Sequence, residues 1–198
     1  MNTELLFATN NNHKLMEAKS IIGNHFRVIS LNEAGINIDI PEKENTIKGN
    51  ALSKARFIYE LTGKNCFADD TGLEVKALDR APGVYSARYA GEMADAEANI
   101  EKLLTNLKGQ SNREARFKTV IALIISGEEH IFEGTVEGFI SETKRGNGGF
   151  GYDPVFIPEG YQQSFAEMKS SEKNSISHRA RALQKMKEFL IAKTRSNF

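Results

Sequence analysis

The chain has 198 residues, with 26 Lys and Arg against 26 Asp and Glu, so its formal net charge is zero. This length suits one domain with a substantial core, and an apolar content of 40% is that of ordinary soluble proteins. A protein held on nucleic acid through its phosphates usually carries a basic excess, so the composition disfavours a nucleic-acid partner.

Cysteine usage and the apolar runs indicate a cytoplasmic protein. Cys66 is the only cysteine, which excludes an intrachain disulfide and suits a reducing compartment. The N-terminus lacks the basic segment and apolar core of a secretory signal. The longest strongly apolar run, residues 120–125, is too short to span a bilayer. We therefore expect no membrane partner, and a packed rather than reactive Cys66 thiol.

The first part of the chain alternates strand and helix. Residues 4–9 predict a short buried strand, residues 14–22 a helix and residues 26–31 a second strand. Residues 50–61 have apolar side chains at helical spacing, which predicts a helix that buries one face. Strands and helices that alternate within so few residues are typical of an α/β protein.

The remaining elements predict a mixed sheet in a single domain over residues 1–198. In chain order they are a strand at 65–70, a helix at 95–107, strands at 115–126 and 130–141, a short strand at 153–157 and a final helix at 176–193. The Ser-Gly-Glu-Glu link between the two long strands predicts a β-hairpin. No internal repeat and no linker rich in Pro or Ser divides the chain.

Residues 9–14, Thr-Asn-Asn-Asn-His-Lys, lie where the first strand should turn into a helix. Such a turn presents backbone N–H groups and the positive end of the helix dipole, which suits a phosphate. Asparagine tolerates left-handed backbone and caps helices, and Lys14 adds a positive charge. The alternative is simple N-capping beside a solvated lysine.

Asp69 and Asp70 end the strand at 65–70. Adjacent strand residues point to opposite faces, so only one of these carboxylates should enter a given site. Strand ends in α/β proteins are where ligands gather, and a carboxylate beside phosphates implies a hard cation, most simply Mg²⁺. The alternative is an Asx turn that terminates the strand.

A polar loop at residues 41–46 leads into the helix that contains Lys54. Glu42 or Glu44 is a candidate for a further metal oxygen. A charged, solvated loop is the alternative for such a stretch.

Residues 81–89, Ala-Pro-Gly-Val-Tyr-Ser-Ala-Arg-Tyr, combine a Pro-Gly turn with aromatic and arginine side chains. This segment could line a pocket or a subunit contact. Core packing of Tyr85 and Tyr89 explains it equally well.

Residues 146–154 and 171–179 bring an aromatic ring, a carboxylate, cations and a histidine next to a glycine-rich backbone. A nucleotide needs such a mixture, because its base must stack and hydrogen-bond while its phosphates are neutralised. A glycine hairpin followed by the capped start of a helix is the alternative.

Taken together, several segments resemble those of one enzyme family. They are Thr-Asn-Asn-Asn-His-Lys (9–14), Pro-Glu-Lys-Glu-Asn-Thr (41–46), Asn-Ala-Leu-Ser-Lys-Ala (50–55), Ala-Asp-Asp-Thr-Gly-Leu (68–73), Ala-Pro-Gly-Val-Tyr-Ser-Ala-Arg-Tyr (81–89), Gly-Gly-Phe-Gly-Tyr-Asp-Pro (148–154) and Ser-Glu-Lys-Asn-Ser-Ile-Ser-His-Arg (171–179). In this order they are similar to the inosine triphosphate pyrophosphatase family, whose bacterial members are dITP/XTP pyrophosphatases. The likeness covers nearly the whole chain.

The resemblance implies an elongated, two-lobed α/β fold with a mixed central sheet flanked by helices, assembled as a homodimer. It implies Mg²⁺-dependent hydrolysis of noncanonical purine triphosphates (ITP, dITP and XTP) to the monophosphate and pyrophosphate, which cleanses the nucleotide pool. Asp70 would be the catalytic base and a metal ligand, Glu42 a second ligand and Asp69 a further candidate. The residues implied to hold the triphosphate are Thr9, Asn10, Asn11, Asn12, His13, Lys14, Lys54 and Thr71. Those implied to bind the base are Phe150, Gly151, Tyr152, Asp153, Lys173, His178 and Arg179.

Two positions depart from the family pattern. Asn10 stands where the family usually has Gly, a mild change because Asn adopts left-handed backbone. Gly49 stands where many members have Glu, which removes a candidate metal or water contact and leaves Glu42 or Glu44 to compensate. Two other functions stay open: a Maf-type pyrophosphatase for modified nucleotides, and a regulator that binds a triphosphate without cleaving it.

Overall fold

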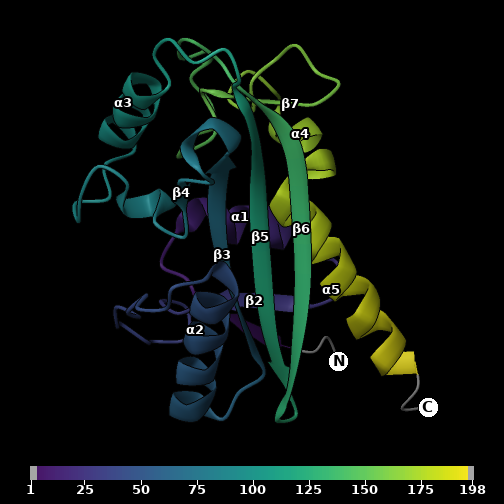
Figure 1. Ribbon diagram of the computed structural model, residues 1–198. Coiled ribbons are helices and arrows are strands. Elements are labelled where there is room, and N and C mark those ends of the chain that lie inside the picture. The colour runs from purple at the N-terminus through teal and green to yellow at the C-terminus, as the bar shows by residue number, and fades with distance from the viewer. Residues whose placement is uncertain (1–3, 196–198) are drawn as a thin grey trace. The chain divides into compact units, whose positions relative to one another are not determined.

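The computed structural model describes residues 4–195 and contains one mixed, seven-stranded sheet (Figure 1). The strands are β1 (Glu4–Phe7), β2 (Arg27–Ser30), β3 (Cys66–Val75), β4 (Pro82–Gly83), β5 (Glu114–Ile125), β6 (Glu128–Ile140) and β7 (Phe156–Pro158). Their order is β2-β1-β3-β5-β6-β7, with β4 paired to β3. Strand β1 runs parallel to both β2 and β3, whereas β4 and β7 run antiparallel to their partners. The expected α/β class with a mixed sheet is confirmed.

Five α-helices accompany the sheet within the described residues. They are α1 (Asn12–Ile22), α2 (Ile47–Thr62), α3 (Ala96–Asn106), α4 (Ser170–Ile176) and α5 (His178–Arg195), together with the 3₁₀ turns η1 (Lys76–Leu78) and η2 (Ser86–Arg88). Among residues 4–195, no helix has both the length and the apolar character needed to cross a membrane.

The chain divides into two compact units. The first unit comprises residues up to Asp70, Thr119–Gly134 and the residues from Arg179 onward, and the second comprises Thr71–Lys118 and Thr135–His178. Each boundary falls inside a strand or beside a helix start, so β3, β5 and β6 each contribute residues to both units.

In the first unit, the pleat of β3 directs successive side chains to two different helical layers. Phe67 stacks on Phe7 of β1 with ring centroids 4.3 Å apart, and both belong to the core formed with α1 and α5. Cys66 points the other way, where its Sγ donates to the Ala55 carbonyl of α2 at 3.3 Å. Burial raises the pKa of this thiol to about 12, so the expectation of a packed, inert cysteine is confirmed.

The second unit has its own aromatic core. Phe117 of β5 contacts Phe156 of β7 edge to face at 4.7 Å, and Phe165 packs against both rings. Helix α3 contributes Ile100 and Leu103, which are fully buried in the same cluster. This core supports the segment between β6 and α4 that contains the glycine run.

Several predicted elements differ from the structure. The strand expected over residues 65–70 continues to Val75, so Asp69 and Asp70 lie within β3 and the alternative of an Asx turn that ends the strand is wrong. The final helix was expected over residues 176–193, but Ser177 has extended backbone (φ −65°, ψ 156°) and separates α4 from α5. The short strand expected over residues 153–157 begins only at Phe156, because the Phe150 N–H donates to the Asp153 carboxylate and closes a turn there. The hairpin link is shorter than expected, with Ser126 and Gly127 both at positive φ between β5 and β6.

Candidate active site

The turn from β1 into α1 carries the first predicted segment. Asn11 caps the helix, since its side chain accepts from the Lys14 N–H at 3.1 Å, and the Asn11 N–H donates to Thr9 Oγ1 at 3.1 Å. Asn10 donates its side-chain amide to the Ile38 carbonyl at 3.0 Å, so this departure from the family pattern has a partner of its own. Capping is therefore confirmed. The same alternative also expected Lys14 to be solvated. That part is wrong, because Lys14 Nζ donates to Asp69.

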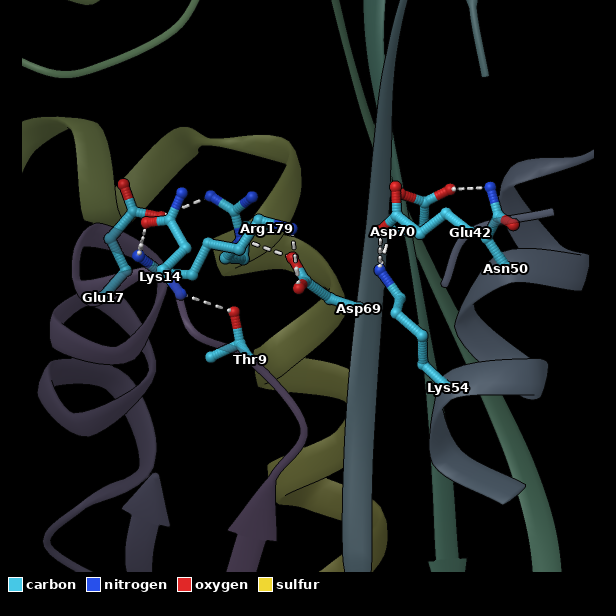
Figure 2. Close-up of polar contacts among 10 residues, drawn as sticks. Thr9, Lys14, Glu17, Glu42, Asn50, Lys54, Asp69, Asp70 and Arg179 are labelled. Atoms are coloured by element: carbon cyan, nitrogen blue, oxygen red, sulfur yellow. Dashed lines mark hydrogen bonds and ion pairs between the residues drawn. The ribbon is translucent and has the colours of Figure 1, made fainter. Parts of the chain in front are cut away.

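Asp69 lies among cations on the α1 and α5 side of β3 (Figure 2). It accepts from Lys14 Nζ at 2.9 Å and from Arg179 Nε at 2.8 Å, and Arg179 Nη1 also donates to Glu17 at 2.6 Å. Asp69 is only 1% exposed and Arg179 only 2%. Burial by itself would raise the pKa of Asp69, but Lys14 and Arg179 outweigh it and hold that pKa well below the usual range. Asp69 is thus an ionised counter-charge for two cations.

Asp70 points to the opposite side of β3, toward α2 (Figure 2). Asn50 Nδ2 donates to Asp70 Oδ2 at 3.2 Å, and Lys54 Nζ lies 3.8 Å from Asp70 Oδ1. Lys54 also donates to Glu42. Burial raises the pKa of Asp70 to about 6, although Lys54 opposes the shift. A carboxyl group with that pKa is a competent proton acceptor near neutral pH.

The carboxylates of Glu42 and Asp70 beside Lys54 match in number those that Mg²⁺ commonly takes from a protein. Glu42 and Asp70 both approach the Lys54 ammonium, so these acidic groups already share one positive charge. Among residues 4–195, no group of three His, Cys, Asp or Glu side chains forms a metal cluster. Mg²⁺ commonly takes one or two carboxylates together with phosphate oxygens, which matches this pair. Glu44 is exposed, so of the two loop glutamates only Glu42 lies beside Lys54.

In the second unit, Asp153 organises the glycine run. Its Oδ2 accepts from the Phe150 N–H at 2.8 Å and from Lys173 Nζ at 2.7 Å, and Lys173 Nζ lies 4.6 Å from the centroid of the Phe150 ring. Gly149 has a φ of 69°, and a Cβ there would lie 2.1 Å from Asp153 Oδ2. Only glycine therefore permits the carboxylate to close over this turn. The structure therefore brings together three of the residues predicted for a base site, Phe150, Asp153 and Lys173.

The other predicted base-site residues have different surroundings. The His178 ring lies against Phe117 with centroids 4.5 Å apart, and the buried Tyr152 donates its hydroxyl to the Ser86 carbonyl at 2.8 Å. Gly151 is a turn residue with a φ of 60°. Arg179 belongs to the first unit, where it is bound to Asp69 and Glu17 as described above.

Of the predicted phosphate-binding residues, Lys14 and Lys54 are each paired with a carboxylate of β3. Asn12 and His13 are exposed at the start of α1, and Thr71 follows Asp70 in β3, where it is partly buried. Sequence reasoning missed two residues: Asn50, which contacts Asp70, and Glu17, which contacts Arg179. Asn50 precedes Lys54 by four residues, so helical spacing alone would have placed both on one face.

Replacing Asp69 or Asp70 by the isosteric asparagine should have different effects on the stability of the protein. We expect Asp69→Asn to lower the free energy of unfolding by about 3 kcal/mol at pH 7, because Lys14 and Arg179 would lose a buried counter-charge. Asp70→Asn should leave the free energy of unfolding unchanged or higher, because burial disfavours ionised Asp70. Urea titrations of both variants measure the difference.

Lowering the pH should remove the difference in the free energy of unfolding between the wild type and Asp69→Asn. The pKa of Asp69 is lower in the folded state, so its contribution is complete above the unfolded value of about 4 and is lost as the pH falls through the lowered value. Equal losses of stability for Asp69→Asn and Asp70→Asn would contradict the division of roles.

Known proteins match nearly the whole chain. The model of the Ham1 family matches residues 5–189. A dITP/XTP pyrophosphatase of Porphyromonas gingivalis is 56% identical over 189 residues, covering 95% of this chain and 97% of the relative, and one of Flavobacterium psychrophilum is 49% identical, covering 94% and 98%. The structure of the Staphylococcus aureus Ham1 protein matches with a TM-score of 0.87 at 39% identity, covering 96% of this chain and 100% of the other. The resemblance seen in the sequence is confirmed, and the chain belongs to the Ham1 family.

Proposed function

We propose that this protein hydrolyses the noncanonical purine triphosphates ITP, dITP and XTP to the monophosphate and pyrophosphate. The observation that carries the proposal is Asp70, a buried carboxyl group with a pKa raised to about 6 beside Lys54 and Glu42. Close relatives named dITP/XTP pyrophosphatases support the choice of substrate. A regulator that only binds a triphosphate would gain nothing from such a base.

Asp70, Lys54 and Lys14 have separate roles in phosphoanhydride hydrolysis. Asp70 accepts a proton from the attacking water, and Lys54 and Lys14 are the cations that neutralise phosphate charge. The N-terminus of α1 offers backbone N–H groups to phosphate oxygens. Mg²⁺ held by Asp70 and Glu42 would add charge neutralisation and orient the phosphates.

Phe150, Asp153 and Lys173 are the residues that select the base. Phe150 offers a ring for stacking, and Lys173 donates to the 6-oxo group of hypoxanthine or xanthine. Asp153 holds both of these residues in place through Oδ2. Because adenine presents a donor at position 6, Lys173 would lack an acceptor there. The paired guanidinium of Arg179 supports a role in holding Asp69 rather than in reading the base.

We also propose that the protein is a cytoplasmic homodimer that does not use nucleic acid as a substrate. The zero net charge and the family likeness support this, and the exposed Tyr85 and Met93, 54% and 92% accessible, are candidates for a subunit contact. Sedimentation velocity of the purified protein tests the dimer.

Asp70→Asn should abolish nearly all turnover while the protein stays folded. Loss of a general base lowers rates by about 10²–10⁴-fold. Steady-state release of pyrophosphate from ITP measures the effect, with the exposed Asp79→Asn as a control that should match the wild type. A folded Asp70→Asn protein with half the wild-type activity would remove Asp70 from the mechanism.

Removal of divalent cations should stop the reaction. Excess EDTA is expected to abolish pyrophosphate release and excess Mg²⁺ to restore it, because the two carboxylates next to Lys54 would no longer hold a cation against the triphosphate. Activity in the presence of Mg²⁺ should rise as the pH passes through about 6, where Asp70 becomes ionised and able to accept a proton, and level off at higher pH. Undiminished turnover in EDTA would rule out the metal requirement.

Lys173→Met should narrow the preference for ITP over ATP. We expect kcat/KM to fall about tenfold or more for ITP and much less for ATP, because only the 6-oxo purine loses a hydrogen bond. Lys102→Met is the matched control, since Lys102 Nζ also lies over an aromatic ring, 4.7 Å from that of Tyr89, in the same unit. Equal proportional losses on both substrates would withdraw the base-reading role of Lys173.

A further inference from the structure

Asn50 is completely buried at the first turn of α2, and its one amide joins two parts of the candidate active site. Its Oδ1 accepts from the backbone N–H of Glu44 at 3.0 Å, and its Nδ2 donates to Asp70 Oδ2 at 3.2 Å (Figure 2). The loop that carries Glu42 is therefore tied directly to the carboxylate proposed as the base.

The chemistry of these contacts calls for asparagine. One neighbour is a donor and the other an acceptor, so the bridging group must accept on one side and donate on the other. An aspartate would keep the contact to Glu44 but could not donate to Asp70 when ionised. A leucine of similar size would leave both partners of Asn50 unsatisfied.

A parallel contact runs through Lys54, one helical turn after Asn50. Lys54 bonds Glu42 of the loop and lies 3.8 Å from Asp70 Oδ1, the oxygen that Asn50 does not contact. Asn50 and Lys54 thus act on different oxygens of one carboxylate.

Gly49 permits the loop to approach the helix this closely. A Cβ at Gly49 would lie 2.8 Å from the Cβ of Glu44 and 2.9 Å from Thr46 Oγ1, the atom that caps α2. Such contacts are too short, so a side chain at this position would force Glu44 or Thr46 to move from the place that each has here.

We propose that Asn50 is a positioning residue that fixes the rotation of the Asp70 carboxylate and the place of the Glu42 loop together, with Gly49 as the residue that allows the loop to reach it. The kinetic consequence rests on the proposed function. The structural consequence, protection of the Glu44 N–H and of the Asn50 side-chain amide, does not.

The kinetic test uses Asn50→Asp and Asn50→Leu. Both should stay folded and lose about 10- to 100-fold in kcat on ITP, with KM within about threefold, because a hydrogen bond to a charged group is lost. Asn50→Leu adds no charge. A fall of kcat in this variant therefore reports the missing hydrogen bond, whereas Asn50→Asp also introduces charge repulsion of Asp70. A folded Asn50→Leu enzyme with wild-type kcat would overturn the proposal.

The matched control is Asn99→Asp in the second unit. Asn99 is also buried, and its amide likewise bridges two groups, accepting from the Ala90 N–H at 2.6 Å and donating to the Ala87 carbonyl at 2.9 Å. This variant should lose stability while keeping its kcat per folded molecule. A comparable fall of kcat in Asn99→Asp would show that any damaged buried amide impairs the enzyme.

The two hydrogen bonds of the Asn50 amide, to the Glu44 N–H and to Asp70, form a bridge that hydrogen exchange followed by NMR can test without any substrate. The Glu44 N–H should stay protected in Asn50→Asp but exchange quickly in Asn50→Leu and in Gly49→Ala, with the exposed neighbour Lys48→Ala as control. Asp70→Ala should expose the Asn50 side-chain amide. Inactive wild-type protein with these exchange results would refute the proposed function and leave the bridge standing, whereas an unprotected Glu44 N–H in the wild type would refute the bridge.

Discussion

The pleat of β3 at Asp69 and Asp70 is the constraint on which the candidate active site depends. Because successive strand residues face opposite ways, two neighbouring carboxylates are delivered to two different layers of the first unit. A single residue of register shift would exchange them and place each in the wrong electrostatic environment. The same strand packs the large Phe67 ring against the core formed with α1 and α5 and the small Cys66 thiol against α2, so such a shift would also exchange side chains of different size between two buried faces.

The two environments explain how identical side chains acquire different roles. Asp69 meets Lys14 and Arg179 at hydrogen-bonding distance, so it stays ionised and holds cations. Asp70 is buried with a weaker set of partners, an amide and an ammonium 3.8 Å away, so its proton affinity rises into the useful range. Catalytic acids and bases commonly arise where neighbouring titratable groups are separated in this way.

Most elements and much of the candidate site could be predicted from the sequence, because their signals are local. Helix α2 follows from its apolar spacing. The hairpin between β5 and β6 follows from the link that contains Gly127, although the link has two residues rather than the four that were expected. The break at Ser177 and the turn at Asp153 could not be predicted in the same way. They depend on backbone conformation and on a side-chain contact to Phe150 that the residue pattern does not encode.

The sequence by itself determined the α/β class, the opposed directions of Asp69 and Asp70, and the family to which the chain belongs, because periodicity and ordered motifs survive without coordinates. Only the tertiary structure decided which charges meet. Arg179 is 110 residues from Asp69, and Asn50 is 20 residues from Asp70. Residues so far apart in the sequence come into contact only through the packing of helices on the sheet. That packing sets the burial and the charge around each carboxylate.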